Sequence, residues 1–518
     1  MAKVQQKQDP VVVIGSGFGG LAAAVRLRAK GYPVVVLEAR DQPGGRASVF
    51  KKDGYTFDAG PTVITAPYLF EELFELVGKN WEDYYEVMPV DPFYRVEFND
   101  GTRFDYVGEE ERLTDQIKDF NPDDVEGYRK LAEHSRRIFE VGYEQLADVP
   151  FDKLSDMLKV LPQIFKLENY RTVYGLVSKY IKDERLRQVF TFQPLLVGGN
   201  PFQTTSIYML IHWLERKWGV HFAKGGTTSI VKALVQLLED IDVEVRVNSP
   251  VEEIEVDEDG VATGVRLESG ERIAAQFVVS NADPLFTYRH MIDPRHRKKH
   301  TDKAVERVKP SMGLFVIYFG TKKTYPDLAH HTIILGPRYR ELLDDIFNKH
   351  VLADDFSLYL HAPTRSDKSM APEGHEAFYV LSPVPNNRSD INWEEEKERY
   401  MDKILDYLDE KYIPGLKENL TVKFCVTPDY FEHELRSIDG AGFGPEPTLS
   451  QSAYFRFHNR SEDVDGLYFV GAGTHPGAGL PGVLSTAKVL DHLVPKSEQP
   501  VELPKAKKSK KKEQPAAE

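Results

Sequence analysis

Cysteine is almost absent from this chain of 518 residues. Because Cys425 is the single cysteine, the chain can form no disulfide within itself and no metal site built from cysteines. The leader Met1–Pro10 is polar and lacks the apolar core of a secretory signal peptide. These features predict a cytoplasmic protein.

Positive charge is in deficit as well. The 66 lysines and arginines against 81 aspartates and glutamates give a net charge of -15. A chain of this sign is poorly suited to nucleic acid, and it disfavours simple electrostatic adsorption to anionic membranes. At roughly 150 residues per domain, the length predicts two to three domains of a soluble protein.

Apolar runs able to span a membrane are also missing. Residues 188–214 and 466–487 carry no Asp, Glu, Lys or Arg, but glycines and prolines interrupt both stretches. Neither could satisfy its backbone as a helix in lipid. We expect both stretches to be buried or to line an apolar space.

The front of the chain carries a dinucleotide-binding pattern. A β-branched run over 11–14 predicts a strand buried on both faces of a parallel sheet, and a glycine-rich loop follows over 15–20. A small-residue helix is expected over 21–30 and a second strand over 34–37. This strand ends in Glu38, 18 residues after the last glycine of the loop.

Each part of this pattern has its own physical role. Gly15 suits the tight turn, Gly17 the close approach of a pyrophosphate and Gly20 the packing of helix on strand. The carboxylate of Glu38 can accept hydrogen bonds from ribose hydroxyls. The alternative is a glycine-rich turn that binds no ligand.

FAD and NAD both use such a unit, and residues 40–47 decide between them. A second glycine pair and Arg46 stand there, in an arrangement that resembles FAD enzymes of the glutathione-reductase-like superfamily, which includes amine oxidases and carotenoid desaturases. The resemblance places Arg46 near the FAD phosphates or the flavin. The alternative is an arginine in a surface loop.

The closing segment has a second glycine-rich motif. A buried strand is expected over 467–470, and a helix is expected to start near Val483 and to run through Val494. Glycines between them let the backbone lie against a flat ring system. The positive end of the helix would face the flavin N1 and C2 carbonyl and stabilise the negative charge of the reduced ring.

Four motifs together resemble the bacterial and fungal type of phytoene desaturase, namely FDAGPT at 57–62, LVGGNPF at 196–202, SNAD at 280–283 and GAGTHPGAGLPGV at 471–483. The resemblance runs from about Val11 to Val494. It implies an FAD enzyme that dehydrogenates C–C bonds of a C40 polyene, from 15-cis-phytoene through ζ-carotene and neurosporene to lycopene. It assigns to FAD Gly15, Ser16, Gly17, Gly19, Gly20, Glu38, Ala39, Gly45, Arg46, Pro61, Thr62, Val251, Gly471, Ala472, Gly482 and Val483; for Val251 the alternative is an ordinary inward strand valine.

The expected fold class is α/β, with a Rossmann-like FAD-binding domain of the glutathione-reductase-like superfamily. The strand pattern stops near residue 68 and resumes near residue 225. The chain is strand-rich again over 311–426, which predicts a second, mostly antiparallel sheet. The expected domains are a discontinuous FAD-binding domain over 1–67, 222–300 and 450–495, a helical, membrane-facing region over 68–221, a substrate domain over 301–449 and a disordered basic tail over 496–518.

The resemblance implies hydride transfer from an allylic carbon to flavin N5, with loss of a proton from the adjacent carbon. No general base can be identified; Asp156 is a weak candidate, and a carboxylate on a helix surface is the favoured alternative. No metal site is expected. His330 and His331 are neighbours, and neighbours in one strand point to opposite faces.

Residues 154–165 predict an amphipathic helix with lysines interleaved, although Pro162 can kink it. Such a helix suits either the membrane interface, where a dissolved hydrocarbon could enter, or packing on a core. Residues 496–518 hold seven lysines against four glutamates, and a basic run of this kind is either a solvated tail or attracts anionic lipid. A cytoplasmic protein on a membrane surface is expected.

Several alternatives stay open. Related enzymes share the flavin motifs: a C30 desaturase, a neurosporene-forming desaturase, an isomerase or a ketolase. A non-enzymatic prenyl-protein chaperone of the GDP-dissociation-inhibitor type resembles this fold without using flavin. Because only one dinucleotide unit is evident, a quinone or oxygen is expected as the electron acceptor. The sequence does not predict the oligomeric state.

Overall fold

Five parallel strands from distant parts of the chain form one sheet. The computed structural model describes residues 8–504, and in it the strand order is β19-β13-β1-β2-β9. Every residue of β1, β2 and β13 is buried, as expected for a parallel sheet covered on both faces. The strands are β1 (Val11–Ile14), β2 (Val34–Leu37), β9 (Glu244–Arg246), β13 (Val278–Ser280) and β19 (Leu467–Phe469).

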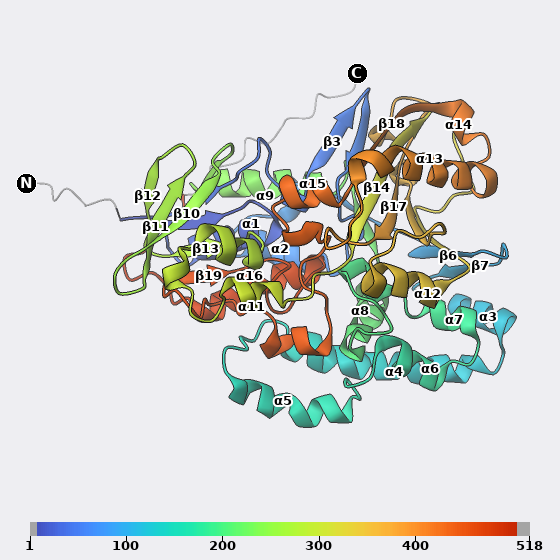
Figure 1. The fold of residues 1–518 in the computed structure, drawn as a ribbon, viewed down its shortest axis with the longest axis horizontal. Helices are drawn as coiled ribbons and strands as arrows, with labels where there is room; N and C mark the ends of the chain where they lie inside the picture. Colours follow the sequence, from blue (N-terminus) through green and yellow to red (C-terminus); the bar gives the residue numbers. More distant parts are fainter. Residues whose placement is uncertain (1–7, 505–518) are drawn as a thin grey trace, which may run out of the picture.

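Helices from both ends of the chain pack beside this sheet (Figure 1). Helix α1 (Phe18–Ala29) lies against α16 (Leu480–Leu493) and α9 (Thr228–Asp240). Nearly all of α1 is buried, which explains why its sequence shows no polar face. It begins three residues before the expected start because the last glycines of the loop already belong to the helix. Helix α2 (Tyr68–Glu75) contacts both α1 and α16.

A smaller antiparallel sheet accompanies the first. The expected hairpin is formed by β10 (Val251–Val256) and β11 (Ala262–Leu267), and β12 (Arg272–Ala274) extends it by one strand. Val251 pairs with Leu267 at the start of the hairpin. Two further pairs of strands are antiparallel: β3 (Val49–Lys52) with β4 (Tyr55–Asp58), and β5 (Val87–Pro89) with β8 (His221–Ala223).

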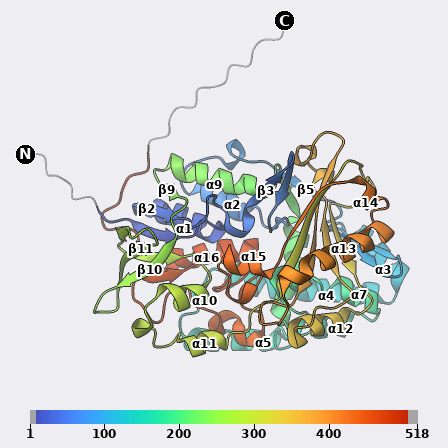
Figure 2. The ribbon, with the colours of Figure 1, turned by 45° about the horizontal axis from the view of Figure 1, so that its top comes forward.

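A second large sheet has the order β18-β14-β17-β16-β15-β6-β7. It is antiparallel except where β15 runs parallel to β6. Figure 2 shows it at the opposite end of the molecule from β10 and β11. Its strands are β6 (Tyr94–Phe98), β7 (Arg103–Tyr106), β14 (Gly313–Thr321), β15 (His331–Leu335), β16 (Leu358–His361), β17 (Glu376–Val384) and β18 (Leu420–Val426).

The prediction that 68–221 is a helical region is wrong for β6 and β7. These short strands close the edge of the second sheet, where Arg95 and Asp105 face each other across the strand pair with an Nε to Oδ1 distance of 2.7 Å. Cross-strand charges of this kind favour a half-buried edge. Both strands alternate apolar and polar residues, so the period-2 signal of a half-buried strand was present in the sequence and was missed.

Most of the remaining helices cover the second sheet and the space below it, whereas α10 and α11 lie beside the first sheet (Figure 1). Helix α4 packs on α8, and α5 lies apart at the lower edge of the molecule in this view. The bounds are α3 (Glu110–Phe120), α4 (Asp124–Phe139), α5 (Leu154–Lys166), α6 (Val173–Tyr180), α7 (Glu184–Val189), α8 (Leu210–Trp218), α10 (Pro284–Phe286), α11 (Asp302–Glu306), α12 (Tyr339–Asp344), α13 (Trp393–Lys411), α14 (Leu416–Asn419) and α15 (Pro428–His433).

The prediction of disorder is wrong for residues 496–504. The backbone N–H of Ser497 donates to Lys30 O at 3.0 Å, and that of Val501 donates to Gly31 O at 2.8 Å. The buried guanidinium of Arg28 donates to the carbonyl oxygens of Val501 and Glu502 at 2.7 and 2.6 Å. Residues 496–504 are therefore packed on the first domain. The lysine-rich run over 505–512 lies outside the described residues.

Candidate cofactor and substrate site

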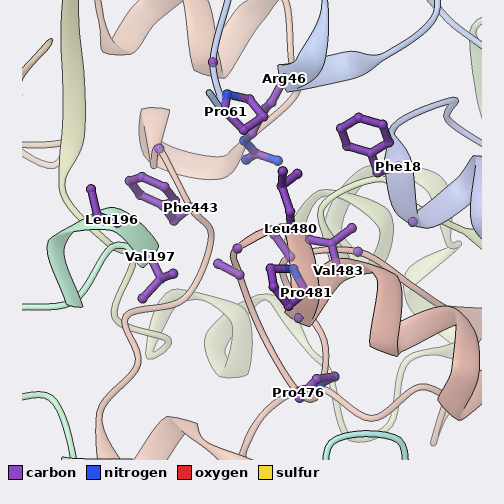
Figure 3. Close-up of a pocket in the computed structure, with 18 of the residues that line it drawn as sticks. Phe18, Arg46, Pro61, Leu196, Val197, Phe443, Pro476, Leu480, Pro481 and Val483 are labelled. Atoms are coloured by element: carbon purple, nitrogen blue, oxygen red, sulfur yellow. The ribbon is translucent and has the colours of Figure 1, made fainter. Parts of the chain in front are cut away.

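One cavity of about 530 Å³ reaches from the first glycine loop to the second sheet and to α5. Its volume lies within the range of ligand sites in proteins. Segments from both ends of the chain line it. Figure 3 shows Phe18, Arg46 and Pro61 around the same space as Leu480, Pro481 and Val483.

The cavity gathers the residues that the sequence assigned to FAD, with the exception of Ser16 and Gly20. They come from loops more than 400 residues apart, which the parallel sheet brings to one edge because β1 and β19 both flank β13. The predicted residues in the cavity wall are Gly15, Gly17, Gly19, Glu38, Ala39, Gly45, Arg46, Pro61, Thr62, Val251, Gly471, Ala472, Gly482 and Val483.

Ser16 and Gly20 lie behind the wall and shape it. The backbone N–H and the hydroxyl of Ser16 donate to Glu38 Oε2 at 2.9 and 2.5 Å, and the N–H of Arg40 donates to Oε1 at 3.0 Å. These bonds hold the Glu38 carboxylate at the cavity wall. A Cβ at Gly20 would collide with the carbonyl oxygen of Gly15, so the helix can approach the loop only with glycine there.

Two further positions require glycine, Gly15 for its backbone conformation and Gly19 for close approach. Gly15 has φ of +89°, a conformation that side chains disfavour. A Cβ on Gly19 would lie 2.9 Å from the backbone nitrogen of Gly471. The first and last glycine loops therefore touch, and together they form a cradle of backbone against which a flat, extended cofactor fits.

Arg46 provides the chemical test of this fit. Its side chain is half-buried in the cavity wall, and its Nη2 donates to Ser437 Oγ at 3.0 Å. Within residues 8–504, its Nε has no hydrogen-bond partner. Burial lowers the pKa of Arg46, while the nearby Asp283 opposes that shift. A half-buried cation with a free, enclosed Nε donor fits an anionic ligand such as the pyrophosphate of FAD.

Helix α16 starts at Leu480, three residues before the predicted start at Val483. Pro481 lies in its first turn, where a missing N–H costs no hydrogen bond. The first turn lines the cavity, so the positive end of the helix faces it. The hydroxyl of Thr486 accepts from the N–H of Gly471 at 2.9 Å and ties the glycine loop to the helix.

Asp156 is not placed to act as a base in the cavity. It lies on α5 but is absent from the cavity wall, and its Oδ1 pairs with Lys159 Nζ at 2.9 Å. This hydrogen bond from Lys159 lowers the pKa of Asp156. The geometry agrees with the alternative of a carboxylate on a helix surface.

Glu215 is a cavity residue that sequence reasoning missed. It is buried on α8 and lines the cavity together with Phe192 and Ile211. The hydroxyl of Tyr94 donates to Glu215 Oε1 at 2.7 Å. Burial raises the pKa of Glu215 to about 8, against the effect of its hydrogen bonds. One signal was available, because Glu215 is the first charged residue after the uncharged stretch 188–214.

The side chains of His330 and His331 do not diverge as predicted. Their ring centroids lie 4.4 Å apart, and His361 lies 4.9 Å from His330. The alternation rule fails here because β15 begins at His331, so His330 precedes the strand.

The profile of the flavin-containing amine oxidoreductases matches residues 18–488. The chain belongs to this family. It is an oxidoreductase with FAD as cofactor, as the glycine motifs predicted. The alternative of a chaperone that does not use flavin is therefore set aside.

Named relatives confirm the predicted resemblance to phytoene desaturases. The lycopene-forming phytoene desaturase of Pantoea ananas is 49% identical over 486 residues, which cover 94% of this chain and 99% of the relative. That of Pseudescherichia vulneris is 50% identical, with 93% and 98% covered. The neurosporene-forming phytoene desaturase of Rhodobacter capsulatus is 44% identical, with 96% of both chains covered.

Solved structures confirm the fold. Putrescine oxidase bound to putrescine has a TM-score of 0.61 at 15% identity, and the match covers 94% of this chain and 98% of the other. Cyclohexylamine oxidase from Brevibacterium oxydans has a TM-score of 0.59 at 16% identity, with the same shares covered. At this identity the likeness is one of fold.

Proposed function

We propose that this flavoprotein converts 15-cis-phytoene to lycopene by successive dehydrogenations through ζ-carotene and neurosporene. The observation that carries the proposal is a cavity that joins the cofactor loops to an apolar wall. A hydrocarbon offers no hydrogen-bonding group, so its site must recognise it by shape and apolar contact. That wall includes Phe192, Leu195, Leu314, Val316, Ile333 and Leu381.

The protein contributes position and electrostatics to the reaction. When bound, FAD supplies the two-electron oxidant that accepts a hydride at N5. The glycine cradle and Arg46 would hold the cofactor at one end of the cavity, and the apolar wall excludes water from the rest. The positive end of α16 favours negative charge at that end.

The proton that leaves the adjacent carbon needs an acceptor, and Glu215 is the group that we infer for this role. Its carboxyl group lies in the cavity wall among apolar side chains. A carboxyl group with a pKa near 8 releases and takes up a proton close to neutral pH, which suits general acid–base work. The Tyr94 hydroxyl holds Oε1 in place.

We further propose that the polyene enters beside α5 from a membrane surface. Val160 and Ile164 on one face of α5, and Leu167 directly after the helix, line the cavity wall. On the outer side, Leu154, Leu158 and Phe165 are 53%, 57% and 64% exposed, which argues against core packing. Exposed apolar side chains with interleaved lysines are typical of an interfacial helix. Among residues 8–504, no helix is long and apolar enough to cross a membrane.

Product analysis tests the proposed function. Purified holoenzyme is incubated without oxygen with phytoene in liposomes and a quinone, and the carotenoids are separated by chromatography. Lycopene is expected only when an acceptor, quinone or oxygen, is supplied. Accumulation of ζ-carotene or neurosporene as the end product, or conversion of a C30 substrate alone, would contradict the assignment. Conversion of more than one phytoene per bound flavin without any added acceptor would indicate an isomerase.

A further inference from the structure

We propose that His330, His331 and His361 form a binding site for a divalent transition-metal cation of the zinc type. One imidazole nitrogen of each lies within 4.8 Å of the others, and all three side chains are buried. Imidazole nitrogens suit zinc and its neighbours among the transition metals, and three histidines leave one position of a tetrahedron for a fourth ligand.

The sheet register brings the three residues together. His331 at the start of β15 pairs directly with His361 at the end of β16, so both side chains lie on the same face of the sheet. The ring centroids of this pair are 5.3 Å apart. The carbonyl oxygen of His330 accepts from the N–H of Ala362 at 2.9 Å, which holds the third histidine beside the pair.

The hydrogen bonds leave suitable nitrogens free. Nδ1 of His330 bonds Ser366 Oγ at 2.7 Å, and Nδ1 of His331 bonds the Tyr359 hydroxyl at 2.7 Å. In the described part of the chain, Nε2 of both rings and both nitrogens of His361 are buried without a partner. Histidine ligands of metals are commonly oriented by a hydrogen bond at the other ring nitrogen. Buried nitrogens without partners are costly, and a metal would satisfy them.

The positive charge nearest to the cluster, on Arg365, is paired with a carboxylate, so it opposes a bound cation less than an unpaired arginine would. Arg365 lies within Coulombic range of His330, but its Nη2 pairs with Glu376 Oε1. Glu376 is fully buried and offsets the positive charge of Arg365.

The site connects to the cavity. The Tyr359 hydroxyl that bonds His331 lies 2.7 Å from Thr62 Oγ1, and Thr62 lines the cavity. A metal at the histidines would fix β15, β16 and the residue before β15 to one another. It would thereby stiffen the part of the cavity wall that contains Thr62 and Tyr359.

Metal analysis of the full-length holoenzyme tests the proposal. The protein is stripped with a chelator, dialysed against zinc and analysed by mass spectrometry of the metal, and its thermal midpoint is measured with and without zinc. One zinc per chain is expected, with a midpoint that rises with zinc concentration because the metal binds the folded state. The variants H331Q and H361Q are expected to lose the zinc and the rise in midpoint.

Two further variants keep the test decisive if a histidine variant fails to fold. Y359F removes the hydroxyl at His331 Nδ1 and is expected to weaken zinc binding about tenfold. H433Q changes an exposed histidine and is the matched control, which should bind zinc as the wild type does. Absence of zinc uptake by the stripped wild type, or equal uptake by the wild type, H331Q and H361Q, would overturn the proposal.

Discussion

Half-buried Arg46 and buried Glu215 are two ionisable groups in the wall of one cavity, and their surroundings give them opposite tasks. Arg46 lies beside the glycine loops, and within the described residues its Nε has no hydrogen-bond partner. Glu215 lies among apolar side chains that favour its neutral form. At the residue scale, one part of the cavity wall is therefore prepared for an anion and another part for a proton.

Replacement of Arg46 by alanine should weaken FAD binding. We expect FAD affinity to fall at least tenfold, because a charge-assisted hydrogen bond to a phosphate is lost. The ratio of flavin absorbance to protein absorbance after gel filtration measures the effect, and circular dichroism verifies folding. R272A, at an arginine that is 71% exposed, is the control and should keep its flavin. A normal flavin content in R46A would contradict the assigned role.

The variant E215Q should lose desaturation while keeping FAD. The amide oxygen can still accept the Tyr94 hydrogen bond, but the side chain can no longer take up a proton. We expect turnover to fall on the order of 100-fold, as for loss of a general base. Lycopene formation per bound flavin is the measurement. Unchanged turnover would remove Glu215 from the mechanism.

The same variant should change how stability depends on pH. The pKa of Glu215 rises on folding from its ordinary value to about 8, so the folded state holds a proton that the unfolded state releases. This stability is present at low pH and is lost as the pH rises toward 8. Between these values, the free energy of unfolding of the wild type should fall by about 1.4 kcal/mol per pH unit more steeply than that of E215Q. Urea unfolding at pH 6 and pH 8 measures the difference, and parallel curves would refute it.

Residues in local motifs could be predicted, and residues joined only by tertiary structure could not. The glycines at 15 and 20 act within a few residues of each other, so their spacing reveals their roles. Glu215 depends on Tyr94, which is 121 residues away, and the histidine cluster depends on a strand register. The spacing of residues along the chain does not show which of these distant residues are in contact.

At the scale of elements, α5 has two apolar sides. Its inner side contributes to the cavity wall and its outer side carries exposed Leu154, Leu158 and Phe165. The periodicity predicted an amphipathic helix but could not decide which surface it covers. The exposed fractions decide against core packing, because a core helix would bury these side chains.

A charged residue on the outer side of α5 should abolish membrane association. L158E places a carboxylate where the interface requires apolar contact, and we expect at least a tenfold drop in the fraction that floats with phytoene-loaded liposomes. V351E, at a valine that is 51% exposed elsewhere, is the matched control and should float as the wild type does. If the wild type itself stays in solution, the interfacial role of α5 is refuted.

At the scale of the whole molecule, the last described residues belong to the first domain. Compared with a protein that lacks 505–518, a protein that lacks 496–518 should have a free energy of unfolding lower by about 1–3 kcal/mol, since its buried Arg28 guanidinium is short of acceptors. Urea unfolding of the two truncated proteins measures this. Equal stability of both would show that the Arg28 contacts contribute nothing.

The parallel sheet also sets the order in which the protein can be completed during synthesis. Strand β1 ends at Ile14, but β19, which covers the free edge of β13, begins only at Leu467. Until that point leaves the ribosome, an apolar strand edge stays open to other chains. At a rate of roughly 5–20 residues per second, the edge of β13 stays open for about 10–40 seconds between the synthesis of Ser280 and that of Leu467. A nascent chain of this protein therefore needs protection from association, and it can retain FAD only near the end of translation.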